Sequence, residues 1–394
     1  MNYKFPEIRT IDDVLPHIKD REEFIVAERE FGTVINYVVS MEDTFPPVKV
    51  AGGSAKMRRE RELAYAIRRE CRGLIFYPDG RIMSRPFHKF FNVGEKEETQ
   101  FKKIDLTQPH VIMEKMDGSM IRPIHVGSQV KLATKMGLSD VAVKAQEWLD
   151  AHTKRDSMLD YLRLCMIHDY TPLFEFVSPD NQIVLNYEKA DLVLLAIRDN
   201  VTGEYLPYSE LDQEYFSVVR TYGSVKDSLE EYVERQRLAE NREGDIIRFA
   251  DGHMLKIKNN WYVRIHKALD RVRFDRNIVD LIINENLDDV VPMMPQVEIE
   301  RIRDFEHRFW VAFKQKENRL YGQYLNATKT YRGDKKRIAL ELVPKLEHKS
   351  DAAFIFRMVD GYDLRDMMIE HVRKGIGTNV KWDACASWMG MERK

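Results

Sequence analysis

The chain has 394 residues, which is long enough for two domains with a well-populated core. Its 62 Lys and Arg residues nearly balance 64 Asp and Glu residues, giving a formal net charge of −2. Binding to nucleic acid through bulk charge is thereby excluded, and any such binding must come from local patches. Three widely spaced cysteines, the lack of a secretory signal and the lack of a long apolar run favour a cytoplasmic protein.

The first organised segment is a helical stretch followed by a hairpin. Residues 58–70 favour a helix, as do residues 139–151 further along the chain. Residues 70–76 then lead through the turn Tyr77-Pro78-Asp79-Gly80 into residues 81–86, which predicts a hairpin by alternation and turn chemistry. The segment His88-Lys89-Phe90-Phe91-Asn92 follows. Taken alone, the charges of this region are as readily explained by solvation as by function.

The most informative segment is Lys115-Met116-Asp117-Gly118-Ser119, which follows the apolar strand-like run 111–113. Asp-Gly is also a common hairpin signal, and this chain has four such pairs, at Asp79, Asp117, Asp251 and Asp360. Only Asp117 has a lysine two residues before it. A lysine at a strand end, just before a tight turn, can attack the α-phosphate of a nucleotide and store the nucleotide as a phosphoramide.

Two later segments carry acids and lysines in strand-like surroundings. The run 173–177 is apolar except for Glu175, and a turn cluster follows it at residues 178–181. After a charged helical stretch, 226–242, residues 243–258 predict a hairpin with Glu243 on one strand and Lys256 and Lys258 on the other. Strand residues two apart share a face, so the two lysines should converge on one spot.

The pattern becomes helical after about residue 265. Apolar residues recur at three- and four-residue intervals at Ile302, Phe305, Phe309, Ala312 and Phe313. The polar face of this helix is expected to carry Arg301, Asp304, Arg308 and Lys316. Residues 291–295 contain two prolines and predict a break between helices. We therefore expect an α+β domain over residues 1–265 and an all-helical domain over residues 266–394.

The order of these motifs resembles that of the covalent nucleotidyltransferase superfamily. Lys-x-Asp-Gly, Phe-Glu-Phe, Glu-Gly and Lys-x-Lys, followed by Trp261-Tyr262, are most similar to the phage RNA ligase 1 family of ATP-dependent RNA end-joining enzymes. The resemblance implies a nucleotidyltransferase (ATP-grasp-like ligase) domain with antiparallel sheets, followed by an all-α domain that selects the RNA. DNA ligases and capping enzymes resemble one another in having a β-rich barrel after the lysine pair. In this sequence no run of short alternating strands follows Lys267, which favours the RNA ligase 1 family.

The resemblance also implies roles for individual residues. Lys115 would be the nucleophile, with Lys256 and Lys258 as catalytic cations. The family carries cations for the triphosphate at the positions of Arg72 and Lys89, and an acid for the ribose at that of Glu175. Magnesium needs few carboxylates because phosphate oxygens and waters complete its shell, and Glu243 is our choice, with Asp288 as a second metal ligand. The full set of ATP-binding residues expected is Arg72, Lys89, Lys115, Asp117, Gly118, Lys135, Glu175, Glu243, Lys256, Lys258 and Tyr262.

Some of these residues have simpler explanations. Lys135 is equally well a surface lysine, and the aromatic pair that includes Tyr262 is more often part of a core. Asp288 suits a helix cap or a solvated turn, and the basic residues near Arg332 suit an ordinary solvated face. Gly118 is expected to supply backbone dihedrals that other residues tolerate poorly.

The activity implied is ATP-dependent joining of RNA 5′-phosphate and 3′-hydroxyl ends in three steps, as in the repair of a cleaved tRNA or another broken RNA. Lys115 takes AMP from ATP, the AMP passes to the RNA 5′-phosphate, and the RNA 3′-hydroxyl displaces it. ATP and Mg²⁺ or Mn²⁺ are the cofactors expected, RNA is the partner, and neither a membrane nor an obligate protein partner is expected. The protein would act in the cytoplasm, which is that of the host if a bacteriophage encodes it. The alternatives are a DNA ligase, a capping enzyme and an inactive RNA-binding relative.

Overall fold

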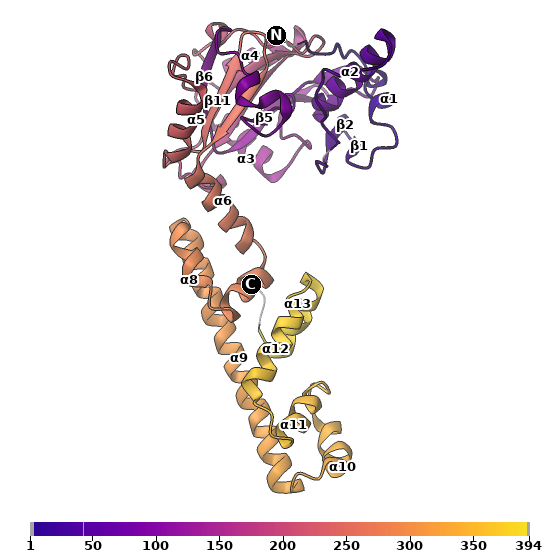
Figure 1. The fold of residues 1–394 in the computed structure, drawn as a ribbon, viewed down its shortest axis with the longest axis vertical. Coiled ribbons are helices and arrows are strands. Elements are labelled where there is room, and N and C mark those ends of the chain that lie inside the picture. The colour runs from indigo at the N-terminus through magenta and orange to yellow at the C-terminus, as the bar shows by residue number, and fades with distance from the viewer. Residues whose placement is uncertain (1–3, 42, 392–394) are drawn as a thin grey trace. The chain divides into compact units, whose positions relative to one another are not determined.

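Figure 1 shows the computed structural model, which describes residues 4–41 and 43–391. The chain divides into two compact units, Met1–Val263 and Arg264–Lys394. In the residues that the structure describes, the first unit holds three four-stranded sheets with helices packed on them, and the second unit is helical. The expected α+β class, with antiparallel sheets followed by helices, is thus confirmed.

The first sheet has the order β1-β2-β3-β4, and its paired strands are antiparallel. The strands are β1 (Phe24–Arg29), β2 (Gly32–Tyr37), β3 (Arg72–Phe76) and β4 (Ile82–Ser84). Helix α2 (Ala55–Glu70) begins at Ser54, whose hydroxyl accepts a 3.3 Å hydrogen bond from the amide of Met57. Ile67 of α2 shares a core with Ile35 and Leu74 of the sheet. The expected helix and the β3–β4 hairpin are both present.

The second sheet has the antiparallel order β10-β9-β7-β8. Its strands are β7 (Ser119–Val126), β8 (Gln129–Ala133), β9 (Tyr170–Val177) and β10 (Asp191–Asp199). Two helices share its core, the expected α3 (Asp140–Ala151) and α4 (Arg155–Ile167). α4 has no counterpart among the expected helices, and it packs through Met158, Leu159, Leu162 and Met166.

The third sheet has the order β5-β12-β11-β6. Its strands are β5 (Phe91–Asn92), β6 (His110–Lys115), β11 (Gly244–Phe249) and β12 (Met254–Lys258), and only β5 and β12 run parallel among the described pairs of this sheet. Helix α5 (Leu229–Leu238) shares its core and is shorter than the expected stretch 226–242. The expected hairpin is formed by β11 and β12. In this sheet, β6, which ends at Lys115, therefore lies next to β11, the strand that precedes the lysine-bearing β12.

Short helical turns complete the first unit. They are η1 (Ile11–Asp13), α1 (Leu15–Ile18), η2 (Glu97–Thr99), η3 (Phe101–Lys103), η4 (Pro179–Asn181) and η5 (Tyr208–Glu210). Helix α6 (Asn260–Val272) begins in the first unit and continues past the division after Val263.

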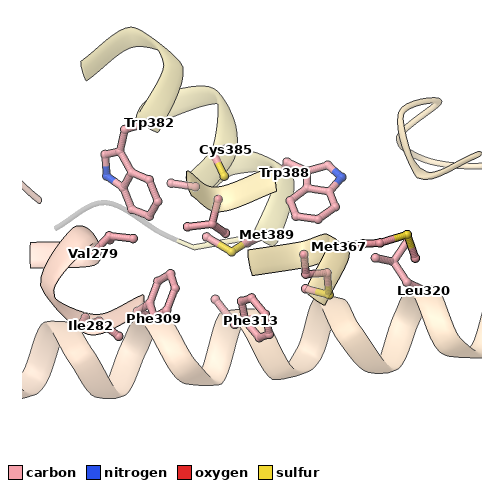
Figure 2. Close-up of a cluster of buried hydrophobic side chains, with 14 of the residues drawn as sticks. Val279, Ile282, Phe309, Phe313, Leu320, Met367, Trp382, Cys385, Trp388 and Met389 are labelled. Atoms are coloured by element: carbon pink, nitrogen blue, oxygen red, sulfur yellow. The ribbon is translucent and has the colours of Figure 1, made fainter. Parts of the chain in front are cut away.

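The second unit is built around the 36-residue helix α9 (Gln296–Tyr331). The other elements are α7 (Asp275–Ile283), α8 (Leu287–Val290), η6 (Val291–Met293), α10 (Lys335–Arg337), η7 (Ile338–Leu342), η8 (Val343–Lys345), α11 (Asp351–Val359), α12 (Leu364–Gly375) and α13 (Asn379–Met389). The break expected at residues 291–295 is present, because α9 starts at Gln296. Figure 2 shows Phe309 and Phe313 of α9 packed towards Trp382 and Trp388 of α13. Among the described residues, no helix is both long and apolar enough to cross a membrane.

Lys316 was expected on the polar face of this helix, and the structure corrects that expectation. Its side chain is only 1% exposed, and its Nζ atom lies 2.9 Å from Oδ2 of the buried Asp351 and 4.6 Å from the ring centre of Trp388. The spacing explains why, since Phe309, Phe313, Lys316 and Leu320 follow one another at four, three and four residues and so share a face. The apolar stripe of α9 therefore carries one buried cation.

Candidate active site

Lys115 ends β6 beside a buried carboxylate. β6 pairs with β11 so that Gly244 lies opposite Lys115, which places Glu243 next to it. The Nζ atom of Lys115 lies 2.6 Å from Oε1 of Glu243, and the Nζ atom of Lys258 lies 3.0 Å from the same oxygen. Gly244 has a φ of +151°, and a Cβ atom there would lie 1.9 Å from the carbonyl oxygen of Ile257. Glycine is therefore required for the approach that joins Glu243 to both lysines.

The turn after Lys115 is fixed by Asp117, which is 1% exposed. Its Oδ1 atom accepts a 2.6 Å hydrogen bond from the hydroxyl of Tyr262, and Oδ2 accepts bonds from the amides of Val184 (2.8 Å) and Leu185 (2.7 Å). The amide of Asp117 itself donates to the hydroxyl of Tyr187 at 3.1 Å. The Asp117 carboxylate thus anchors the turn and does not line the cavity described next.

Gly118 is needed for a reason other than the one expected. It is not among the glycines with a positive φ, so unusual dihedrals do not require it. A Cβ atom at this position would lie 2.4 Å from the carbonyl oxygen of Phe176. The Gly118 amide donates a 3.1 Å hydrogen bond to Oε1 of Glu175. Glycine here allows the lysine turn to lie directly against β9.

Lys115 lies on the wall of a cavity of about 250 Å³. Six of the expected site residues line it, namely Arg72, Lys89, Lys115, Glu175, Lys256 and Lys258. The remaining lining residues are Tyr37, Phe87, Phe90, Met113, Glu114, Met116, Met120, Leu195, Ile246 and Met254. The cavity therefore combines an apolar, methionine-rich wall with a group of cations, which suits a ligand with a flat apolar part and a strongly negative part.

The cations of the cavity act on one another, and Lys256 shows this most clearly. Burial, together with the positive charges of Lys89, Arg72 and Lys115 and against the opposing charge of Glu95, lowers the pKa of Lys256 to about 7. At neutral pH this lysine is about half charged. A negatively charged ligand would therefore be taken up together with a proton.

Lys89 lies in an aromatic setting. Its Nζ atom donates a 3.3 Å hydrogen bond to the hydroxyl of Tyr37 and lies 5.0, 5.4 and 5.5 Å from the ring centres of Tyr37, Phe45 and Phe91. Cation–π contacts of this kind hold an ammonium group in place without neutralising its charge. Lys89 thus keeps its charge available to a ligand.

Tyr37 is a lining residue that the motifs did not indicate. Burial raises the pKa of its hydroxyl, but the charges of Lys89, Arg72 and Lys135 outweigh this and leave the pKa lowered. The Nζ atom of Lys135, itself exposed and outside the cavity lining, lies 5.9 Å from the Tyr37 ring centre. A tyrosine at the end of an apolar run has no distinctive spacing, so only the folded arrangement shows that three cations surround it.

Glu175 is the acid most affected by its surroundings. Burial, opposed by the charge of Lys115 and reinforced by that of Glu243, raises the pKa of its carboxyl group to about 7. At neutral pH the group can therefore both donate and accept hydrogen bonds. Such a group can exchange hydrogen bonds with a pair of hydroxyl groups.

Several expected residues lie outside the cavity lining: Asp117, Gly118, Lys135, Glu243 and Tyr262. Of these, Glu243 contacts two lining lysines, whereas Asp117 and Tyr262 support the turn. Asp288 lies on α8 in the second unit, where its Oδ1 atom is 2.7 Å from Nη2 of Arg303. Its expected role as a metal ligand stays a prediction.

No group of three or more His, Cys, Asp or Glu side chains is arranged to hold a metal ion anywhere in residues 4–41 and 43–391. Magnesium bound with a nucleotide needs only one or two carboxylates, because phosphate oxygens and waters complete its coordination. Glu114 and Glu175 line the cavity, and Glu243 lies against Lys115 and Lys258. These donors fit a divalent ion that arrives with a nucleotide.

The fold and the site together are those of a nucleotide-dependent ligase, an enzyme class in which a lysine receives the nucleotide. The model of a protein family described as RNA ligase matches residues 70–262. A putative RNA ligase of Thermovibrio ammonificans is 31% identical over 326 residues, covering 75% of this chain and 84% of the relative. RNA ligase 1 of bacteriophage TS2126 is 32% identical over 143 residues, covering 35% of this chain and 36% of the phage protein.

A solved archaeal ATP-dependent RNA ligase is 15% identical, with a TM-score of 0.42, and the match covers 92% of this chain and 95% of that one. The sequence relatives are sufficient on their own to assign the family. The chain belongs to the RNA ligase family that includes phage RNA ligase 1, and the resemblance noted from its motifs is confirmed.

Proposed function

We propose that this RNA ligase uses ATP to join RNA 5′-phosphate and 3′-hydroxyl ends through a lysyl-AMP at Lys115 and an RNA adenylate. The observation that carries the proposal is the position of the Lys115 amine. It lies on the wall of a cavity lined by four further cations and 2.6 Å from a buried carboxylate. An amine so placed can meet the α-phosphate of a nucleotide whose remaining charges are already neutralised.

In the first step the Nζ atom of Lys115 forms a bond to the α-phosphorus, and pyrophosphate leaves with the electrons of the broken P–O bond. Before this step the amine must lose a proton, which for an ordinary lysine at pH 7 costs roughly 4–5 kcal/mol. A bound Mg²⁺ or Mn²⁺, with Glu243 as its protein ligand, would supply positive charge at the α-phosphate. It would also compete with Lys115 for the Glu243 carboxylate.

The lysine pair stabilises the charge that develops on the α-phosphate. Lys256 and Lys258 are two apart on β12 and both line the cavity. Because Lys256 is about half charged at neutral pH, a phosphate beside it draws it into the charged form. Its full charge thus develops where the transition state needs it.

The rest of the nucleotide is bound by groups of the first unit. Arg72 and Lys89 bind the β- and γ-phosphates, with Tyr37 holding Lys89 in position. Glu175 binds the ribose hydroxyls, and the methionine-rich wall offers polarizable apolar surface to the adenine ring. ATP, and not a larger dinucleotide, is the ligand that this set of contacts supports best.

The two units divide the work between nucleotide and RNA. Residues 1–265 form the adenylyltransferase domain, because every lining residue of the cavity lies within them. Residues 266–394 form the helical domain that chooses the RNA, such as a cleaved tRNA. In the second step the RNA 5′-phosphate takes AMP from Lys115, and in the third the RNA 3′-hydroxyl displaces AMP. Both substrates are available in the cytoplasm, where the repair of broken RNA would take place.

The test is covalent labelling with ATP carrying a radioactive α-phosphate. The wild-type protein should become labelled and release pyrophosphate, and Lys115→Ala should not label. The same variant should still seal RNA that was adenylated beforehand, because only the first step uses the lysine. Labelling of Lys115→Ala would overturn the assignment of the nucleophile, and an unlabelled wild-type protein would support the inactive RNA-binding relative.

A second assay separates the remaining alternatives. RNA and DNA strands with 5′-phosphates are incubated with the enzyme and ATP, GTP or NAD, and the joined products are measured. An RNA ligase joins RNA ends with ATP in preference to the other combinations. Preferential joining of DNA favours a DNA ligase, and transfer of GMP to an RNA 5′ end favours a capping enzyme.

A further inference from the structure

The first unit contains a fully buried arginine without an acidic partner. Arg122, on β7, is 0% exposed. Its Nε and Nη1 atoms are buried and have no hydrogen-bond partner in the described residues. Burial alone lowers the pKa of this guanidinium to about 9, and no neighbouring charge offsets that effect. Burying a charged group without a compensating partner destabilises the folded state, so we expect a functional reason for Arg122.

Two other buried arginines of the same unit are each stabilised by a buried carboxylate. Arg85 and Arg198 are also 0% exposed, and both share the buried carboxylate of Glu70, at 3.0 Å and 2.8 Å. Each therefore has its charge compensated inside the core. Arg122 has no such compensation, although it lies in an equally buried position.

The hydrogen bond that Arg122 does make joins two sheets. Its Nη2 atom donates to the carbonyl oxygen of Gly73, which belongs to β3 of the first sheet, whereas Arg122 belongs to β7 of the second. Gly73 has a φ of +101°, and a Cβ atom there would lie 2.5 Å from the carbonyl oxygen of Lys135. Three segments therefore meet at Gly73: β3, β7 and the turn after β8.

These segments also carry the groups of the cavity. β3 begins at Arg72, directly before Gly73, and β7 begins at Ser119, directly after the Lys115 turn. Arg122 is three residues along β7 from that start. Its bond to Gly73 thus fixes the distance between the strand that carries Arg72 and the turn that carries the nucleophile.

We propose that Arg122 is a positioning residue that holds Arg72 in register with the Lys115 turn and so sets the affinity of the site for the triphosphate of ATP. The inference rests on the proposed function. Arg122 does not line the cavity and does not touch the nucleotide. Its effect is transmitted through the Gly73 carbonyl and through its uncompensated charge.

The experiment compares Arg122→Met and Arg122→Lys with a matched control, Arg248→Met. Arg248 is also buried, donates to a backbone carbonyl oxygen (that of Leu206), has a buried Nη1 atom without a partner and does not line the cavity, but its bond does not join β7 to the strand that carries Arg72. For each full-length variant, the KM for ATP and the kcat of self-adenylation are measured, together with the rate of sealing of pre-adenylated RNA. Thermal unfolding shows whether each variant folds.

Arg122→Met should raise the KM for ATP at least roughly tenfold, the size expected when a hydrogen bond involving a charged group is lost. Sealing of pre-adenylated RNA, which carries no triphosphate, should change by no more than about twofold. Arg122→Lys keeps the charge and should recover part of the ATP affinity. Arg248→Met should leave the KM for ATP at the wild-type value.

Two results would overturn the inference. One is an unchanged KM for ATP in Arg122→Met. The other is an equal fall of kcat in self-adenylation and in sealing at constant KM, which would mean that Arg122 only stabilises the fold. A wild-type protein that fails to label at all contradicts the proposed function instead, so the two failures are distinguishable.

Discussion

The amine of Lys115 lies 2.6 Å from Oε1 of Glu243, and that same oxygen is 3.0 Å from the amine of Lys258. One buried carboxylate therefore serves two ammonium groups, and the three side chains together carry a net charge of +1. The ion pair keeps the nucleophile in place but in its charged, unreactive form. Reaction thus requires that Glu243 be drawn away from Lys115 or neutralised.

Glu243→Gln removes the negative charge but keeps the size and a hydrogen-bond acceptor. We expect self-adenylation to fall at least about 100-fold, because the proposed metal ligand is lost, and this loss outweighs the release of Lys115 from its ion pair. Initial labelling rates over a range of Mg²⁺ and Mn²⁺ concentrations measure the effect. Glu243→Asp is the control and should retain part of the activity. An unchanged rate and metal requirement in Glu243→Gln would show that this carboxylate is only structural.

Lys256→Met should change how ATP binding depends on pH. The pKa of Lys256 is about 7 without ligand, and a bound triphosphate raises it, so binding takes up a proton and the affinity falls as the pH rises above about 7. Titration calorimetry in buffers of different ionisation enthalpy measures that proton uptake. In Lys256→Met the uptake should fall and the affinity should fall about tenfold or more. Equal proton uptake in the variant would assign the titration to another group.

Glu175→Gln should stabilise the protein above neutral pH at the expense of activity. The folded-state pKa of Glu175 is raised from 4.5 to about 7, so the folded protein holds a proton that the unfolded chain releases between these values. The stability contributed by this proton is present below pH 4.5 and is lost as the pH rises through 7. Thermal unfolding should therefore show the variant more stable by roughly 2–6 °C at pH 8. At pH 4.5 the two proteins should unfold at the same temperature.

The buried pair of the second unit predicts a double-mutant cycle. Lys316→Met leaves Asp351 as an uncompensated buried acid and should lower the free energy of unfolding by about 3–5 kcal/mol. Asp351→Asn leaves Lys316 unpaired but keeps an oxygen for the Trp388 Nε1 donor, which is 2.7 Å from Asp351. The double variant should recover most of the loss, because it buries no charge. Denaturant unfolding followed by tryptophan fluorescence measures all four proteins, and additive losses would show that the pair is not coupled.

The sequence predicted those parts of the molecule in which local pattern and local chemistry agree. The strand before Lys115, the hairpin that carries Lys256 and Lys258, and the helix capped by Ser139 all have their own turn or cap residues nearby. Strand periodicity alone is enough to give both lysines of the hairpin a shared face. These features can be predicted because residues close by in the sequence determine them.

Residues whose roles depend on distant partners could not be predicted in this way. Tyr37 lies beside Lys89, 52 positions later, and Lys316 pairs with Asp351, 35 positions later. In the sequence, Arg122 is only a charged residue in a strand, and its lack of an acidic partner is visible only once the sheets are assembled. The need for Gly118 likewise depends on Phe176, whose carbonyl oxygen occupies the space that a side chain would need.

Helix α6 has a practical consequence for dividing this protein into fragments. It begins at Asn260, two residues before Tyr262, whose hydroxyl holds Asp117, and it continues to Val272, beyond the division after Val263. A fragment cut before Asn260 would keep every group that lines the cavity but would lose the hydroxyl that fastens the nucleophile's turn. A fragment cut after Val272 would retain both the cavity-lining groups and the Tyr262 hydroxyl. The minimal self-adenylating fragment is thus delimited by a helix end, and the boundary between compact units would be the wrong place to cut.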